Sequence, residues 1–245
     1  MATATQRRSE GVVAACEDRD LLGFELWPRQ RELLASVEHG RLHVWALGRR
    51  SGKTTLAALV GLHDCLLRPE LAAMVRPGER RFVVCVATNL RQARLFVRAA
   101  ASIVERSPKL RGLVESVSED EIEFKTGATL AAFPATSRGA RGWPISTLLF
   151  DECAHMIDSE GNQAAEPMWR SLVPSTSQFG PAARIIVAST PYGQDGLFAS
   201  LYQQASSGEL ADATATQATT AEMNPTIDRA TLAAEQLRDP DGYRS

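Results

Sequence analysis

The stretch LHVWALGRRSGKT, residues 42–54, decides how this chain folds. Its first six residues are mostly apolar and predict a buried strand. The loop that follows ends in Gly52-Lys53-Thr54, and Thr54 to Leu67 then has the character of a helix. A loop between a strand and a helix presents backbone N–H groups and the positive end of the helix dipole to phosphate oxygens. We therefore interpret the stretch as a cradle for nucleotide phosphates.

Individual residues of this loop have expected roles. Lys53 is placed to reach the β- and γ-phosphates, and Thr54 is placed to hold Mg²⁺. The simplest form of the motif has its first glycine at position 47, but Leu47 stands there and Gly48 follows. A Gly-Lys-Thr triplet also occurs by chance in loops, and the flanking strand and helix favour phosphate binding here. The predicted nucleotide-binding residues of the loop are Gly48, Arg49, Arg50, Ser51, Gly52, Lys53, Thr54 and Thr55.

A second stretch, ISTLLFDE at residues 145–152, predicts a buried strand that ends in two carboxylates. In open α/β sheets, ligands bind at the carboxyl ends of the strands. Asp151 is then placed to organise Mg²⁺ through water, and Glu152 to orient and polarise the attacking water in phosphoryl transfer. An ordinary strand-to-helix junction with Asp151 as the helix cap is the alternative. The phosphate loop upstream favours the catalytic interpretation.

The composition fits one large α/β domain. The chain has 245 residues, of which 44% are hydrophobic and 23% charged, enough for a sizeable core. The formal net charge of −2 excludes a uniformly basic nucleic-acid-binding domain, so any such contact must be local, transient or contributed by an assembly. No apolar run approaches the length of a membrane span or a secretion signal. Free thiols in a reducing compartment are expected for Cys16, Cys65, Cys85 and Cys153, which lack metal-binding spacing.

Alternating strands and helices predict a mostly parallel sheet. Buried strands are expected at Arg41–Leu47, Arg81–Ala87, Ile145–Phe150 and Arg184–Ser189, and a hairpin at Glu121–Lys125 and Thr129–Phe133. Helices are expected at Trp27–Val37, Thr54–Leu67, Leu90–Glu105, Glu166–Leu172, Gly196–Ala205 and Ile227–Leu237. Residues 1–23 are interpreted as an N-terminal arm, loose or with a short helix, and 24–207 as the core. Residues 208–245, with a small and polar stretch at Ala211–Thr220, are interpreted as the start of a linker or lid subdomain.

Two polar residues outside these strands are candidates for the same site. The amide of Gln30 can donate to and accept from an adenine edge at once, although a surface glutamine of a helix is the alternative. Thr190 follows the strand Arg184–Ser189. If that strand neighbours the carboxylate strand, a hydroxyl there can sense the γ-phosphate; otherwise it belongs to an ordinary turn.

The loop at residues 137–142 contains Arg138 and Arg141 among glycines. Such arginines suit an arginine finger, which stabilises charge on the transferred phosphoryl group. They suit contact with a nucleic-acid backbone equally, and a solvated basic loop is the third interpretation. His155 follows the two carboxylates closely and either couples to the site or has only a structural role.

Together these features resemble the ATPase domain of the large terminase subunit of tailed bacteriophages, the motor that packages DNA into capsids. The resemblance covers roughly residues 24–245, and its most family-specific feature is Arg49, three positions before Gly52. Large terminases carry a nuclease domain after the ATPase domain, and this chain ends before one, so an isolated motor domain without nuclease activity is expected. The matching motifs are WPRQ at 27–30, the loop at 48–54, VAT at 86–88 with QA at 92–93, RG at 141–142, LLFDE at 148–152, STPYG at 189–193 and NP at 224–225.

The resemblance implies a P-loop NTPase of the additional-strand, RecA-like type, which uses ATP and Mg²⁺ to translocate double-stranded DNA. It implies metal support by Thr54 and Asp151 and catalytic roles for Glu152, Arg141, Arg49 and Arg138.

The implied partners are double-stranded DNA, the portal protein, the small terminase subunit and, on the capsid, further copies of this chain in a ring. Alone, the chain is expected to be monomeric. It is expected in the host cytoplasm and is not expected to bind a membrane. A helicase-like remodelling ATPase is one alternative, because residues 151–155 loosely resemble helicase strand signatures. A non-catalytic ATP-binding switch is another, against which the intact Glu152 argues.

Overall fold

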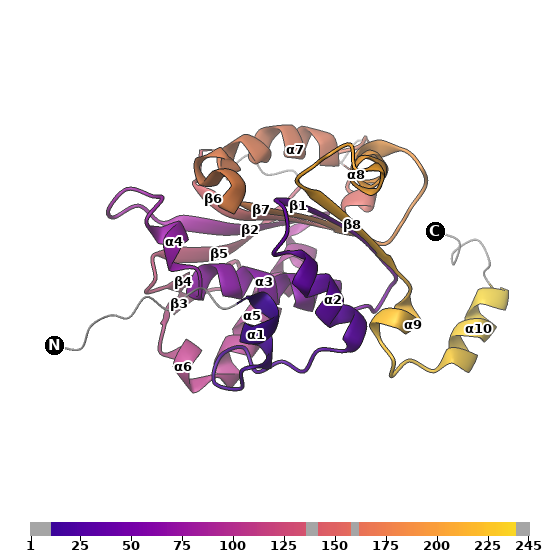
Figure 1. The fold of residues 1–245 in the computed structure, drawn as a ribbon, viewed down its shortest axis with the longest axis horizontal. Coiled ribbons are helices and arrows are strands. Elements are labelled where there is room, and N and C mark those ends of the chain that lie inside the picture. Colours follow the sequence, from indigo (N-terminus) through magenta and orange to yellow (C-terminus); the bar gives the residue numbers. More distant parts are fainter. Residues whose placement is uncertain (1–10, 136–141, 158–161, 239–245) are drawn as a thin grey trace.

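A computed structural model of the chain describes residues 11–135, 142–157 and 162–238 (Figure 1). Its centre is one sheet, to which the described residues contribute eight strands. These strands are β1 (Leu42–Leu47), β2 (Arg81–Ala87), β3 (Val114–Val117), β4 (Glu121–Phe124), β5 (Ala128–Pro134), β6 (Ile145–Asp151), β7 (Arg184–Ser189) and β8 (Ala213–Ala218). Across the sheet they follow the order β3-β4-β5-β2-β6-β7-β1-β8.

Most of the sheet is parallel, as predicted. Strands β5, β2, β6, β7, β1 and β8 pair in parallel, and β4 is antiparallel to both β3 and β5. Strands β1, β6 and β7 are buried along their whole length, as their apolar sequences require when helices cover both faces. Strand β7 lies between β1, which leads to the phosphate loop, and β6, which carries the carboxylates. This insertion is the additional-strand arrangement.

Helices cover the two faces of the sheet in separate layers (Figure 1). One layer contains α1 (Val12–Glu17), α2 (Pro28–Ser36), α3 (Lys53–Leu66), α5 (Leu90–Arg106) and α6 (Pro108–Arg111). The other contains α7 (Ala165–Leu172), the 3₁₀ segment η2 (Val173–Ala182) and α8 (Gly196–Ser207). Neighbouring residues of β1 show the two cores, because Trp45 packs into the first layer and Val44 into the second. The remaining short elements are α4 (Pro69–Ala72), η1 (Cys153–His155), α9 (Thr220–Met223) and α10 (Arg229–Arg238).

The structure corrects the prediction for the C-terminal part of the chain. Residues 211–220, predicted to be linker-like, contain β8, which pairs in parallel with β1 from Leu42↔Ala213 to Leu47↔Ala218. Strand β8 lies at the sheet edge and is mostly half-buried, so small polar residues suffice and no apolar run signals it. The sheet therefore extends past residue 207, where the sequence placed the end of the core. The short, exposed edge strand β3 escaped prediction for the same reason.

Within the described residues, which begin at 11, the N-terminal segment contains a short helix, one of the two forms that the sequence allowed. Helix α1 buries Val12, Ala15 and Cys16 completely in the core. The four cysteines are free and buried, and burial raises the pKa of Cys16, Cys65 and Cys153 to about 12. Within the described part of the chain, no helix is both long and apolar enough to cross a membrane.

Candidate nucleotide-binding site

The phosphate loop, residues 48–52, links the end of β1 to the start of α3. Gly52 has φ +86° and Arg50 has φ +57°, so the loop makes its turn through the left-handed region. Glycine adopts that conformation without strain, which accounts for Gly52. Among the described residues, no side chain caps α3 at its start. The first N–H groups of the helix therefore remain donors for an anion.

Lys53, the first residue of α3, lies almost buried under this loop, with 7% of its side chain exposed. Its Nζ atom lies 3.3 Å from the carbonyl oxygens of Leu47 and Gly48 and 3.2 Å from Thr190 Oγ1. A Glu152 oxygen lies 3.4 Å away. All four distances are longer than those of tight charge-assisted hydrogen bonds, so phosphate oxygens can compete for this ammonium group.

Thr54 and Asp151, the residues predicted to support Mg²⁺, lie side by side. Thr54 Oγ1 donates to Asp151 Oδ2 across 3.1 Å. Burial, together with the neighbouring charge of Glu152, raises the pKa of Asp151, while Thr54, Lys53 and Gln92 oppose that shift. A hydroxyl and a carboxylate are the oxygen donors that Mg²⁺ prefers, and a cation would favour the ionised carboxylate. The residues present thus fit Mg²⁺.

Glu152 stands directly after β6 in a strained backbone conformation, with φ 54° and ψ 44°. Such a conformation costs a non-glycine residue about 1–3 kcal/mol and is concentrated at functional sites. It directs the carboxylate back to the cradle, where Oε2 accepts from the backbone N–H of Thr190 at 3.2 Å and Oε1 faces Lys53. Because 26% of the side chain remains exposed, Glu152 is accessible to water.

Thr190 meets the condition that the sequence set for it, because β7 pairs directly with β6. Its hydroxyl lies 3.2 Å from Lys53 Nζ and 3.5 Å from Glu152 Oε2. One residue earlier, Ser189 Oγ accepts from the N–H of Ala154 at 3.2 Å and ties the chain after Glu152 to β7. His155 lies beside Tyr192, with ring centroids 4.9 Å apart.

Gln30 is buried against the phosphate loop instead of lying on a helix surface. Its Nε2 donates to the carbonyl of Ser51 at 3.3 Å, and its Oε1 accepts from the N–H of Trp27 at 3.3 Å. The amide therefore supports the loop, and adenine recognition by Gln30 stays a prediction. Ser51 Oγ is buried and has no hydrogen-bond partner among the described residues. A buried hydroxyl of this kind in the loop fits a nucleotide phosphate as its missing partner.

The C-terminal segment braces the phosphate loop from outside. The N–H of Gly48 donates to the carbonyl of Ala218 at 3.0 Å, Thr220 Oγ1 donates to the carbonyl of Arg49 at 2.8 Å, and Asn224 Nδ2 lies 3.4 Å from the carbonyl of Arg50. A Cβ atom on residue 48 would lie 2.4 Å from Thr220 Oγ1. The close approach requires glycine there, while Leu47 belongs to the buried strand.

Sequence reasoning missed the role of Thr220 and noted Asn224 only as part of a turn and of a family motif. The displaced glycine at position 48 was the available signal for the brace. The side chains of Arg49 and Arg50 are exposed. The two other arginine candidates, Arg138 and Arg141, lie outside the described residues.

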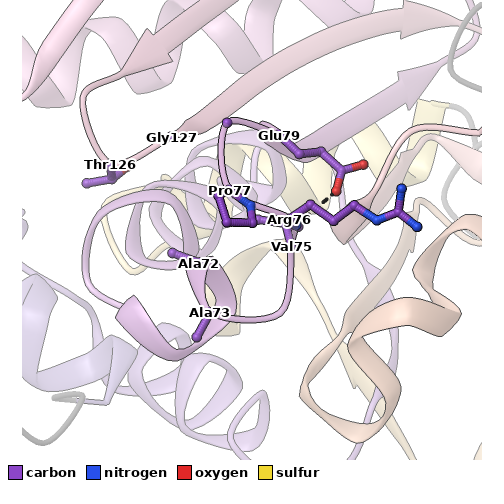
Figure 2. A pocket seen from close by; sticks show the side chains of 9 residues that line it. Ala72, Ala73, Val75, Arg76, Pro77, Glu79, Thr126 and Gly127 are labelled. Atoms are coloured by element: carbon purple, nitrogen blue, oxygen red, sulfur yellow. Dashed lines mark hydrogen bonds between the residues drawn. The ribbon is translucent and has the colours of Figure 1, made fainter.

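A cavity of about 400 Å³ lies elsewhere, at the amino ends of β2 and β5 (Figure 2). Its two charged lining residues are Arg76 and Glu79, and the backbone N–H of Arg76 donates to Glu79 Oε2 at 3.1 Å. Short or apolar side chains and glycines form most of the remaining wall. Because none of the groups expected to bind phosphate or metal lines it, this cavity is not the nucleotide site.

The sheet order, the loop between β1 and α3, and the carboxylates at the end of β6 define a P-loop NTPase of the additional-strand type. Comparison with known families narrows the class. The model of the family "Terminase large subunit, T4likevirus-type, N-terminal" matches residues 45–240. The chain therefore belongs to the large-subunit terminases of bacteriophages, as the motifs predicted.

Solved structures agree in fold. The large terminase of bacteriophage HK97 superposes with a TM-score of 0.66 at 16% identity, over 97% of this chain and 49% of that protein. The ATPase domain of the Thermus phage P74-26 large terminase superposes with a TM-score of 0.64 at 18% identity, over 96% of this chain and 95% of that domain. A mutant of the same domain superposes with a TM-score of 0.66 at 18% identity, over 92% of this chain and 93% of that domain. The chain thus spans about half the length of the HK97 large terminase.

Proposed function

We propose that this chain is the ATP-hydrolysing motor domain of a DNA-packaging terminase and couples ATP hydrolysis to translocation of double-stranded DNA into a capsid. One observation carries the proposal. In a chain of the large-terminase family, Lys53, the Thr54–Asp151 pair and the Glu152–Thr190 pair converge at the carboxyl edge of the sheet. A phosphate cradle, a metal support and a carboxylate that water can reach are what ATP hydrolysis needs from a protein.

Each group has a separate task in this proposal. The loop N–H groups and Lys53 bind the phosphates and compensate their charge. Thr54 and Asp151 would hold Mg²⁺, which neutralises charge on the β- and γ-phosphates when bound. Glu152 accepts a hydrogen bond from the attacking water and aims it at the γ-phosphate. Because Thr190 contacts both Lys53 and Glu152, it is placed to transmit loss of the γ-phosphate to β7.

The arginines are assigned from the sequence and the family. Arg141 is proposed as the finger that acts on a neighbouring subunit, with Arg138 as its alternative, while Arg49 positions ATP within its own subunit. These roles require a ring of this chain on the capsid, together with the portal protein and the small terminase subunit, in the host cytoplasm. We propose no nuclease activity, because two-metal cleavage uses clustered carboxylates. No group of three or more metal-ligating side chains occurs among residues 11–135, 142–157 and 162–238.

Steady-state phosphate release from MgATP tests the proposal, with Glu152→Gln as the diagnostic variant. The parent is expected to turn over slowly alone, with a rate per subunit that rises with protein concentration as neighbours supply their arginines. Glu152→Gln should bind ATP with parental affinity and lose roughly 10²–10⁴-fold in rate, the usual contribution of a general base. The matched control is Glu166→Gln, which removes an exposed carboxylate paired with Arg170.

Two results would contradict this function. A near-parental rate in Glu152→Gln would remove the catalytic assignment of the β6 carboxylate. A parent that binds ATP but releases no phosphate at any protein concentration, with or without double-stranded DNA, would make the chain a nucleotide-dependent switch.

A further inference from the structure

Arg50, in the middle of the phosphate loop, has a strained backbone that the roles assigned above do not explain. Its φ of +57° lies in the left-handed region, which residues with a side chain rarely occupy. Apart from glycines, only Arg50 and Glu152 have a positive φ among the described residues. Such a conformation persists only where the surrounding structure holds it in place.

The chain after β8 holds the two peptide groups on either side of Arg50. The carbonyl oxygen of Arg49, in the peptide group before Arg50, accepts from Thr220 Oγ1 at 2.8 Å. The carbonyl oxygen of Arg50, in the peptide group after it, lies 3.4 Å from Asn224 Nδ2. Thr220 is the first residue of α9, and Asn224 directly follows that helix. Because the φ and ψ of a residue follow from the orientation of its two flanking peptide planes, these contacts fix the left-handed turn at Arg50.

The sheet brings Thr220 to the loop. Strand β8 pairs with β1 as far as Leu47↔Ala218, and the N–H of Gly48 continues this pairing by donating to the carbonyl of Ala218 at 3.0 Å. The chain after β8 therefore lies beside the loop after β1. The contact of Thr220 with Arg49 thus follows from the strand order.

The peptide group that follows is held from another part of the chain, because Gln30 Nε2 in α2 donates to the carbonyl of Ser51 at 3.3 Å. No peptide bond in the described residues is cis, so the N–H of each peptide group points away from its C=O. The N–H groups of Arg50, Ser51 and Gly52 are consequently turned away from the side chains that hold these carbonyls. Those of Arg50 and Gly52 donate to no acceptor within the described part of the chain. Successive N–H groups presented in this way bind anions.

We propose that Thr220 is a positioning residue for nucleotide binding, whose hydroxyl holds the Arg49 carbonyl and keeps the N–H groups of the loop in the orientation that phosphate requires. Asn224 supports it on the other side of Arg50. The inference rests on the proposed function, because it assigns Thr220 to the same ATP site. Thr220 acts through the peptide groups of the loop and touches no phosphate itself. Without its hydroxyl the turn at Arg50 can relax, and nucleotide binding must then restore it, which lowers the affinity.

The test is the affinity for MgADP, measured by calorimetry at a temperature where the parent and all variants are folded. Thr220→Val keeps the shape of the side chain and removes the donor. Its affinity is expected to fall at least about threefold, the effect of losing one hydrogen bond that orders the loop. Thr220→Ser keeps the hydroxyl and should bind within about twofold of the parent.

Thr231→Val is the matched control, because it makes the same chemical change at an exposed threonine of α10 whose hydroxyl bonds locally to Asp228. Its MgADP affinity should equal that of the parent. Thermal unfolding without nucleotide separates binding from stability. If Thr220 served the fold alone, Thr220→Val would lower the Tm and leave the MgADP affinity of the folded protein unchanged.

The inference is overturned if Thr220→Val loses less than about threefold in MgADP affinity. It is also overturned if Thr220→Ser or Thr231→Val loses as much as Thr220→Val. These outcomes leave the proposed function intact, because the parent still binds MgADP in each of them. If the parent itself binds no MgADP, the proposed function fails and the inference falls with it.

Discussion

The two ends of the parallel strands carry two different polar clusters, and helix α3 runs from one to the other. At the carboxyl end, Lys53 begins α3 beside Glu152. At the amino end, Asp64 lies in the last turns of α3 and pairs with Arg184, the first residue of β7. Both clusters contain buried charges, so burial of charge alone does not distinguish a catalytic site from a structural one.

The difference lies in how closely the carboxylate at each end is held by its partners. Asp64 accepts from Thr147 Oγ1 at 2.7 Å, contacts His63 at 3.0 Å and pairs with Arg184, which also pairs with Glu38 at 2.8 Å. Burial by itself raises the pKa of Asp64, but Arg184 and the other cations outweigh burial and hold the pKa well below its usual range.

The residues at the carboxyl end are held more loosely. It has long contacts to Lys53, a strained Glu152 and a Ser51 hydroxyl without a partner among the described residues. Buried donors without a partner among the described residues also occur near Asp64, at Arg68 Nη1 and at Arg81 Nε and Nη1. The contrast is therefore between an Asp64 carboxylate that several close partners hold and a Lys53–Glu152 pair whose contacts are long.

Of the substitutions that test this comparison, Asp64→Asn is expected to have the largest effect on the unfolding free energy. Removing the charge leaves Arg184 buried with an incomplete set of partners, and breaking a buried pair in this way costs about 3–5 kcal/mol of unfolding free energy. Denaturant titration measures it. The control is Glu166→Gln, which breaks the exposed pair with Arg170 and should cost under about 1 kcal/mol. Equal losses of unfolding free energy in the two variants would show that the buried Asp64–Arg184 pair stabilises the fold no more than an exposed pair does.

A smaller effect is expected on the pH dependence of the unfolding free energy. Burial, with Arg184 nearby, lowers the pKa of His43 from 6.5 to about 4. Since the unfolded chain binds this proton near pH 6.5 and the folded chain only near pH 4, the unfolding free energy falls as the pH drops through that window. The loss from this group between pH 7 and pH 4.5 is about 2–3 kcal/mol.

His43→Asn should remove that part of the pH dependence, because asparagine stays neutral and retains a donor near the position of Nδ1. Denaturant titrations of parent and variant at pH 7 and pH 4.5 measure the difference. His39→Asn, at an exposed position, is the control and should keep the parental slope. An unchanged slope in His43→Asn would mean that His43 is not buried in its neutral form.

Much of this arrangement was predictable from sequence, because its signals are local. The apolar strands, the Gly-Lys-Thr loop and the Asp151-Glu152 pair are each encoded in a short stretch, and alternation of elements predicted the parallel sheet. Strand β8 could not be predicted in this way. It is an edge strand made mostly of alanine and threonine, and it is a strand because it pairs with β1. The contact of Thr220 with the phosphate loop depends on where the chain returns after β8, and no local pattern specifies it.

The binding affinity for MgADP in two variants, measured by calorimetry at a temperature where both are folded, tests the central claim most directly. The claim is that the carboxyl end of the strands binds the nucleotide and that the amino end supports the fold. Lys53→Ala should weaken MgADP binding at least on the order of 10-fold, because it removes a desolvated contact to phosphate. Its stability should change little. Asp64→Asn should bind within about twofold of the parent once folded, since its charge lies at the far end of α3. A parental affinity in Lys53→Ala, or a comparable loss in folded Asp64→Asn, would contradict the account.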